Sequence, residues 1–163
     1  MISVSKLIEK MIVYSEGNLN DIQHFMKVWG YAKLIGELEQ LDSHTQLILE
    51  IAAVTHDIAC PLCREKYGNA NGKLQEIEGP ELVSHFLEDT GMTKDDIARV
   101  AFLVGHHHTY TEIDHLDYQI LLEADYLVNA DESNYSTEAI KDAYRTIFKT
   151  KTGMHLLKEM YSV

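Results

Sequence analysis

The side chains most suited to chemistry in this sequence are a few histidines and aspartates in otherwise apolar segments. They are His24, His56, Asp57 and Asp125. Neutral imidazole and carboxylate groups are the ligands expected for zinc, iron, manganese and similar ions. Helices that converge on such a set commonly build a metal site inside a helical bundle. The four residues therefore predict a metal centre held by two histidines and two aspartates.

Asp125 stands on an apolar stripe of a predicted helix. Its neighbours about one turn away are Leu121, Leu122 and Val128. An ionised carboxylate in such surroundings is costly unless a cation or hydrogen-bond donors compensate its charge. Because no basic residue lies on the same segment, the partner must come from another segment or be a metal ion. A buried salt bridge is the alternative to a metal site.

His56 and Asp57 are adjacent at the end of a strongly apolar segment, TQLILEIAAVTH. Adjacent helical residues diverge by about 100 degrees, so both can reach one ion only where the helix ends and the chain turns. The alternative interpretation is a buried structural histidine beside a solvated aspartate. His24, taken alone, is equally typical of a surface or capping residue.

The order and spacing of these residues resemble the HD-domain superfamily of metal-dependent phosphohydrolases. Its pattern is a histidine, then an adjacent His-Asp pair, then a distant aspartate in a helix. His24, His56-Asp57 and Asp125 match this pattern, within LEIAAVTHDIA and LLEADYLVN, and the resemblance spans about residues 20–132. It implies an all-α fold and a metal-activated water that attacks a phosphoester.

The resemblance also implies roles for individual side chains. Asp57 would orient or deprotonate the water, and His106 or His107 would stabilise negative charge or protonate the leaving oxygen. The implied substrate is a small phosphorylated molecule, cleaved as a monoester or a diester, with a nucleotide as the leading candidate. The rings of Tyr67, Tyr110 or Tyr126 could stack on a base, although tyrosines more often serve packing.

Relatives that bind two metals carry a histidine ahead of one helix and another at the end of the next. Gln75 stands at the first position, and His106 matches the second by register, with His107 as the other candidate. Because glutamine is a weak ligand, we predict one tight metal and a second metal or water site from Gln75, Glu76, Glu78 and His106. The metal is expected to be Fe, Mn, Ni, Co or Zn, and Mg is compatible.

Relatives often carry a lysine shortly after the His-Asp pair that helps to hold phosphate, whereas this chain has Ala59-Cys60-Pro61. Contact with substrate phosphate would then fall to Arg64, Lys66 or Lys73, or to a histidine of residues 106–108. Each of these cations can equally be a solvated surface charge. His85 is expected to be a structural or surface histidine.

The elements that must position these residues are helices. Apolar residues recur at helical spacing, and no segment alternates as a strand would. We predict an all-α compact bundle of about six to eight helices in one domain, residues 1–163. The helices are expected near residues 7–12, 20–38, 45–56, 79–89, 93–108, 116–130, 137–148 and 153–161. Residues 60–73, with Pro61, Gly68 and Asn71-Gly72, are expected to form the longest loop.

Charge and composition narrow the classes of partner. The sequence contains 26 acidic and 14 basic residues, which gives a net charge of -12. Because this charge repels a phosphate backbone, we expect no binding to a nucleic-acid polymer. No stretch approaches the ~20 apolar residues of a membrane span, and Lys6, Glu9 and Lys10 interrupt what a signal peptide would need. We therefore expect a cytoplasmic protein without a membrane contact. Cys60 and Cys63 lack a second pair and are expected to be reduced thiols, with a redox or metal role as the alternative.

Two rival functions remain. Some relatives use a paired iron site for oxygenation, as in inositol oxygenase, but Gln75 argues against that chemistry. The other is a regulatory domain that binds a metal or nucleotide without turnover, which the missing lysine favours. A homo-oligomer is also compatible, since apolar residues of the terminal helices can complete the core or form a dimer face: Ile8, Ile12, Leu156, Leu157 and Met160.

Overall fold

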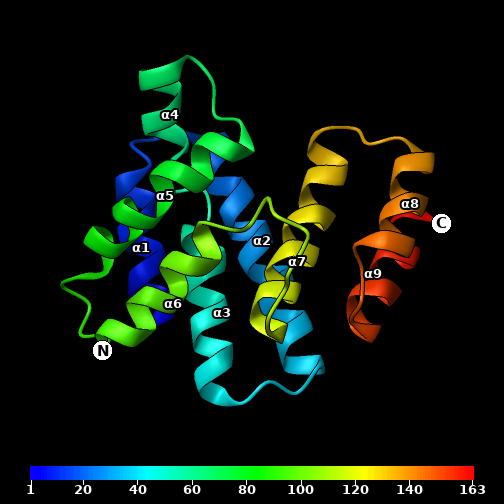
Figure 1. The fold of residues 1–163 in the computed structure, drawn as a ribbon, viewed down its shortest axis with the longest axis horizontal. Helices are drawn as coiled ribbons and strands as arrows, with labels where there is room; N and C mark the ends of the chain where they lie inside the picture. The colour runs from blue at the N-terminus through cyan, green and yellow to red at the C-terminus, as the bar shows by residue number, and fades with distance from the viewer.

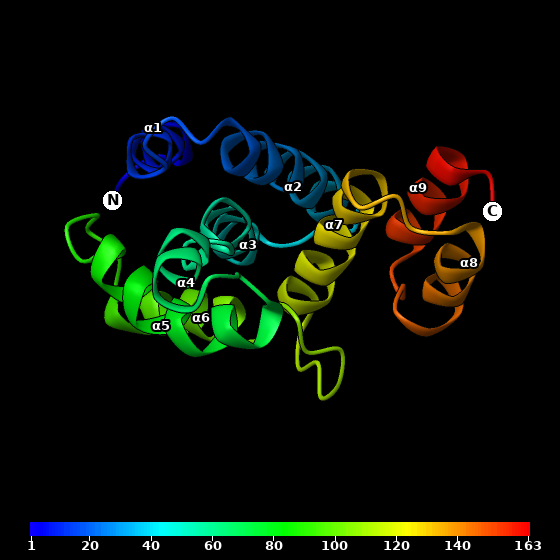
Figure 2. The same ribbon diagram turned by 90° about the horizontal axis from the view of Figure 1, so that it is seen from above.

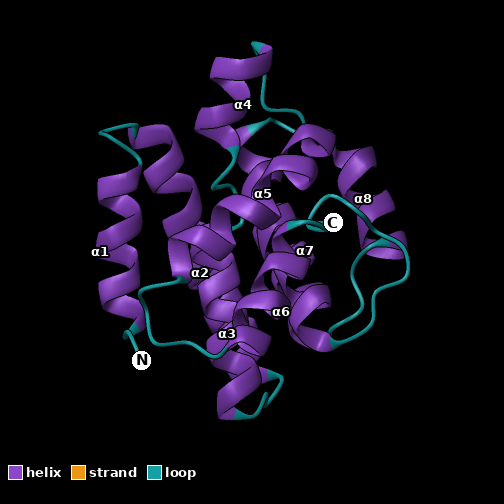
Figure 3. Cartoon of the chain, turned by 60° about the vertical axis from the view of Figure 1, so that its left-hand side comes forward, coloured by secondary structure: helices purple, strands orange, loops and turns teal.

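The computed structural model describes residues 1–163 and contains nine helices and no strand (Figures 1 and 3). The all-α prediction is confirmed. In chain order the helices are α1 (Val4–Tyr14), α2 (Leu19–Leu38), α3 (Ser43–Thr55), α4 (Cys60–Tyr67), α5 (Gly72–Leu87), α6 (Lys94–Val104), α7 (Leu116–Glu132), α8 (Thr137–Thr146) and α9 (Lys151–Tyr161).

Two expectations for residues 60–89 were wrong. Residues 60–67 form α4 in place of a loop, because Pro61 fits a first helical turn and Gly68, at φ +76°, ends the helix. Helix α5 begins at Gly72 and not at Gly79, because the Asn71 side chain accepts a hydrogen bond from Leu74 N and caps the helix there. Pro80 therefore lies inside α5.

The N-caps explain where the other helices begin. Thr93 and Ser136 cap α6 and α8, each accepting a hydrogen bond from the backbone N–H three residues on. Helices α2 and α3 start slightly earlier than expected, because Asn18 and Asp42 cap them. The capping signals were present in the sequence, but several neighbouring polar residues could have served.

Helix α3 is the centre of the bundle. It packs against α1, α2, α6 and α7, and its last eight residues are buried. Helices α2 and α7 also pack against each other, whereas α8 and α9 cover the far side of α7 (Figure 2). The three helices that carry or adjoin His24, His56 and Asp125 are thus in mutual contact.

The apolar residues of the terminal helices mostly complete the core. Leu157 is fully buried, and Ile8 and Leu156 pack against the core cluster. Ile12 and Met160 remain exposed. One stretch, Ser43–Tyr67, has the length and mean hydropathy of a membrane-spanning helix. However, 72% of its most apolar window is buried inside the fold, as in the core helix of a globular protein.

Candidate metal centre

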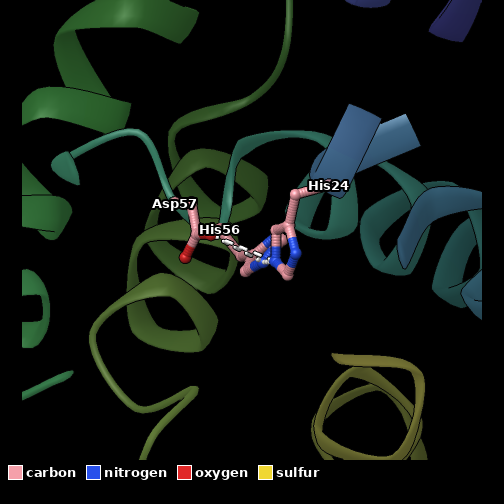
Figure 4. A group of neighbouring side chains, drawn as sticks. All are labelled: His24, His56 and Asp57. Carbon is pink, nitrogen blue, oxygen red and sulfur yellow. Dashed lines mark hydrogen bonds and ion pairs between the residues drawn. The ribbon is translucent and has the colours of Figure 1, made fainter. Parts of the chain in front are cut away.

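The structure brings His24, His56, Asp57 and Asp125 to one point, and we call these four residues the first cluster. Figure 4 shows three of them, His24, His56 and Asp57. His24 Nε2 lies 3.1 Å from His56 Nε2, 3.1 Å from Asp57 Oδ2 and 3.2 Å from Asp125 Oδ1. His56 Nε2 lies 3.4 Å from each of the same two carboxylate oxygens. His56 and Asp57 can both face this point because α3 ends at Thr55 and the chain turns there.

Both imidazoles of the first cluster are held through their Nδ1 atoms. His24 Nδ1 lies 2.5 Å from Glu132 Oε1, and His56 Nδ1 lies 2.7 Å from the carbonyl oxygen of Ala53. These acceptors assign the proton to Nδ1, which leaves a lone pair on each Nε2. With both rings neutral, two lone pairs and two carboxylate oxygens face one another, so a cation, either a proton or a metal ion, must lie between them.

The buried carboxylate of Asp125 indicates that the first cluster requires a cation. Its Oδ1 atom is buried and has no hydrogen-bond partner. A buried carboxylate oxygen without a donor is costly, and a cation among the facing atoms would remove that cost. Imidazole nitrogen and carboxylate oxygen are ligands that divalent transition metals accept. The residues present therefore fit a divalent metal ion.

The electrostatics of the first cluster also favour a cation. Burial lowers the pKa of His24, but Asp125 and Asp57 outweigh it and raise that pKa to about 11. Burial raises the pKa of Asp125, but the imidazoles of His24 and His56, at 3.2 and 3.4 Å from its Oδ1 atom, bring that pKa below its usual range. Burial likewise raises the pKa of Asp57, and His56 and His107 lower it well below the ordinary value. The point between these residues attracts positive charge.

A second group of ligands adjoins the first and shares Asp57; we call Asp57, Gln75, His107 and His108 the second cluster. Asp57 Oδ1 lies 3.3 Å from His107 Nε2, whereas its Oδ2 faces the first cluster. Gln75 Oε1 lies 3.2 Å from His107 Nε2 and 3.4 Å from His108 Nε2. The Gln75 amide nitrogen donates to the carbonyl of Ala70 at 2.6 Å, which turns its oxygen towards the imidazoles.

His106, expected at this second site, lies outside it. Its Nδ1 atom is 2.7 Å from the carbonyl oxygen of Phe102, and its ring stacks on the Phe102 ring at 4.0 Å. His107 takes the inward position, and its own Nδ1 lies 2.7 Å from the carbonyl oxygen of Val104. Helix α6 ends at Val104, and a shift of one residue turns a side chain by about 100 degrees.

The two glutamates expected beside Gln75 are also engaged elsewhere. Glu76 accepts hydrogen bonds from His108 N at 3.2 Å and from the Thr109 hydroxyl at 2.8 Å, so it holds the segment that carries the histidines. Glu78 accepts from Lys66 and from the Tyr67 hydroxyl. Glu76 therefore supports the second cluster from outside, and Glu78 does not contribute to it.

The sequence offered His108 only as one of three candidates for phosphate contact and not as a metal ligand, and it did not indicate Glu132. His108 is packed against Gly72, where an added Cβ would come within 2.6 Å of its ring. Burial and the neighbouring His107 lower the pKa of His108 to about 4. Gly72 is the signal that could have indicated this close approach. Glu132 had no local signal, because its partner His24 is remote in sequence.

The cations expected to hold phosphate differ in their surroundings. Arg64 makes a bidentate contact with Asp21, at 2.5 and 3.2 Å, and Asp21 lies one turn before His24 on α2. Lys66 pairs at 2.7 Å with Glu78, which belongs to neither cluster. Lys73 is exposed. Arg64 is thus the candidate cation beside the rim of the metal centre.

The remaining candidates have ordinary surroundings. Tyr126 is buried and its ring packs against Tyr135 and Phe148, so it is not free for a base, whereas Tyr110 is half-exposed. Cys60 and Cys63 are buried free thiols, and burial raises the pKa of each. Thiols of raised pKa are poor nucleophiles and ligands. His85 is exposed and pairs with Glu88.

Comparisons with known proteins agree with this geometry. The family model described as the HD domain matches residues 21–135, which include every residue of both clusters. The fold is similar to the crystal structure of a predicted HD superfamily hydrolase from an uncultured Thermotogales bacterium. The TM-score is 0.70 at 23% identity, over 97% of this chain and 84% of that one. No curated protein matches the sequence.

Proposed function

The chain belongs to the HD domain family, and from this premise we propose that it is a metal-dependent phosphohydrolase acting on a small phosphorylated substrate. One observation carries the proposal. Two imidazoles and two carboxylates converge in the core around an Asp125 oxygen that has no hydrogen-bond partner. Such a constellation is unfavourable without a cation, and it resembles the ligand set of this family.

Asp57 is the residue best placed to act on the attacking water. A divalent ion bound at the first cluster would lower the pKa of a water and polarise a phosphoryl oxygen. Asp57 has one oxygen towards each cluster, so it can orient a water between them and accept its proton. His107, 3.3 Å from Asp57, can stabilise the developing negative charge or protonate the leaving oxygen. The position of His106 against Phe102 gives it no such role.

We assign the tight metal to the first cluster and a weaker second metal, or a bound water, to the second cluster. The first offers two imidazoles and two carboxylates, whereas the second offers Gln75 in place of a stronger ligand. Imidazole-rich ligation favours Fe, Mn, Co, Ni or Zn over Mg. This assignment replaces Glu76, Glu78 and His106 by His107 and His108 at the second site.

Arg64 is our candidate for contact with substrate phosphate. It is partly exposed beside Asp21, and Asp57 contributes to raising its pKa, after the hydrogen bond with Asp21. A phosphate dianion can compete with Asp21 for the guanidinium, because both are bidentate acceptors. Within phosphorylated substrates a nucleotide remains the leading candidate, with half-exposed Tyr110 available to stack on a base.

The rival functions are less well supported. A paired iron oxygenase would need strong ligands at both metals, and Gln75 weakens the second site. A binding domain without turnover would not require Asp57 to face both clusters. We further propose a single domain in the cytoplasm that interacts with a small molecule, and its acidic charge disfavours nucleic acid.

The test is turnover by apo-protein reconstituted with one metal at a time. Phosphate release from nucleoside phosphates and nitrophenyl mono- and diesters would be measured with Mn²⁺, Co²⁺, Zn²⁺, Fe²⁺ and Mg²⁺, beside Asp57→Asn under the same conditions. We expect metal-dependent hydrolysis that Asp57→Asn abolishes. Stoichiometric metal without turnover would favour the binding domain, and metal-dependent oxygen consumption would favour the oxygenase.

A further inference from the structure

We infer that Glu132 is a positioning residue of the metal centre, which fixes the tautomer and orientation of His24. The inference rests on the metal site proposed above. Glu132 is the last residue of α7, two turns beyond Asp125 on the same helix. Its Oε1 lies 2.5 Å from His24 Nδ1, and its Oε2 accepts from Lys27 Nζ at 3.2 Å. A chain of contacts therefore connects α7 and α2, running from Asp125 to His24, then to Glu132 and then to Lys27.

His24 needs such a residue because of where it lies in its helix. His56 and His107 follow the ends of α3 and α6, so each can donate from Nδ1 to the carbonyl three residues earlier, Ala53 or Val104. His24 lies within α2, where the helix's own N–H groups use the carbonyls. An acceptor for its Nδ1 proton must then come from another element, and Glu132 of α7 supplies it.

The acceptor for His24 is a carboxylate, whereas the acceptors for His56 and His107 are backbone carbonyl groups. A carboxylate that accepts from Nδ1 makes the opposite nitrogen a stronger metal ligand than a carbonyl does and restricts rotation of the ring. Lys27 lies one turn after His24 on α2 and holds the other oxygen of Glu132. Glu132 is thereby held in position from both oxygens, although its side chain is 29% exposed.

The effect of Glu132 should be measurable as metal affinity. Loss of such an outer partner weakens metal binding by about 10- to 100-fold. We therefore expect Glu132→Ala to weaken Co²⁺ binding within that range. Glu132→Gln keeps an oxygen that can accept from Nδ1 but loses the charge, so its affinity should lie between those of Glu132→Ala and the wild type.

Asp131→Asn is the matched control. It removes one negative charge from the adjacent exposed position at the same helix end and leaves His24 untouched. Calorimetric titration of the four apo-proteins with Co²⁺ gives the dissociation constants, and thermal unfolding of the same apo-proteins reports stability. Asp131→Asn should bind Co²⁺ within about threefold of wild type, since an exposed charge contributes little.

The outcomes separate this inference from the proposed function. The expected result is the affinity order wild type, Glu132→Gln, Glu132→Ala, with folded apo-proteins in every case. Wild-type affinity in Glu132→Ala would overturn the positioning role and leave the metal site intact. An equal loss in Asp131→Asn would reduce the role to net charge and overturn it. Absence of Co²⁺ binding by the wild type would overturn the metal site itself.

Discussion

Helix α7 carries two buried carboxylates only two residues apart, and the protein surrounds them in opposite ways. Glu123 is fully buried and accepts from the Gln119 amide at 2.7 Å, from the Thr150 hydroxyl at 2.7 Å and from Thr150 N at 3.2 Å. Asp125 is 3% exposed, and its Oδ1 has no donor and faces His24 and His56. A buried carboxylate that accepts hydrogen bonds from its neighbours, like Glu123, stabilises the fold. A buried carboxylate that faces imidazole nitrogens without accepting a hydrogen bond, like Asp125, requires a cation.

Replacement of Asp125 should have the largest effect on function. Asp125→Asn removes a charged metal ligand, so we expect turnover to fall by about 10³-fold or more and bound metal to be lost. The apo-protein should be about as stable as wild-type apo-protein, because the repulsion between Asp125 and Asp57 is removed and His24 keeps Asp57 as its partner. Turnover assays and thermal unfolding of the apo-proteins check both parts. A large loss of apo-protein stability would make Asp125 a structural residue like Glu123.

Replacement of Glu123 should produce the reverse effect. Glu123→Ala leaves the donors of Gln119 and Thr150 without an acceptor in the core, so the free energy of unfolding should fall by about 3 kcal/mol. Metal content should remain that of wild type, because Glu123 faces the connection between α8 and α9. Denaturant unfolding together with metal analysis distinguishes the two residues. Loss of metal from folded Glu123→Ala would contradict the distinction.

The adjacent histidines His106 and His107 test the second cluster. His107→Ala should lower turnover by about 10²-fold, since His107 is the candidate acid beside Asp57. His106→Ala should retain turnover within about threefold and lose only its packing on Phe102. Steady-state kinetics of the two variants on one substrate decide the matter. The opposite ranking would restore the position originally expected for His106.

A substitution at Gln75 should strengthen the second cluster. Gln75→His would place an imidazole next to His107 and His108, and the affinity for a second metal should rise by about tenfold or more. The measurement is metal stoichiometry after dialysis at a fixed free metal concentration, with wild type alongside. An unchanged stoichiometry would show that Gln75 does not limit the second metal.

Just before α7, Asp114 is paired with a cation of the protein itself, Arg99. Replacement of Asp114 should have the smallest effect of those considered, and the effect should be on stability. Arg99 holds Asp114 through two contacts of 2.7 and 2.9 Å and lowers the Asp114 pKa from 3.8 to about 2. Because the folded-state pKa is depressed, the stabilisation is complete above about pH 4 and is lost as the pH falls through 2. Since Asp114 is 38% exposed, Asp114→Asn should cost at most about 1 kcal/mol.

The acid dependence of unfolding checks this last prediction. Wild type and Asp114→Asn should differ in their free energy of unfolding at pH 5 and converge towards pH 2. A constant difference across this range would show that the Arg99 contact does not act through the charge of Asp114.

The first cluster could be predicted from the sequence because each of its residues is anomalous where it stands. Asp125 lies among Leu121, Leu122 and Val128, and His56 directly follows α3, whose last eight residues are buried. Their apolar surroundings in the sequence already indicate that each polar side chain needs a cation or a hydrogen-bond partner from another segment. The helical fold follows from the same apolar periodicity, but α4 was missed, the start of α5 was misplaced, and α6 ends at Val104 and not near residue 108.

The second cluster could not be assigned from sequence because it depends on where one helix ends. With α6 ending at Val104, His107 points inward and His106 outward, and a helix one residue longer or shorter would change which side chain points inward. Glu132 was missed for a different reason. Its contact joins residues 108 positions apart, and nothing near Glu132 distinguishes it from other acidic residues at a helix end.

Metal content by elemental analysis of purified wild-type protein, beside Asp125→Ala reconstituted in the same way, tests the metal centre most directly. We predict about one tightly held transition metal per wild-type chain, with a second that dialysis removes, and none in Asp125→Ala. Absence of metal from the wild type after reconstitution, or equal metal in folded Asp125→Ala, would contradict the account of the metal centre.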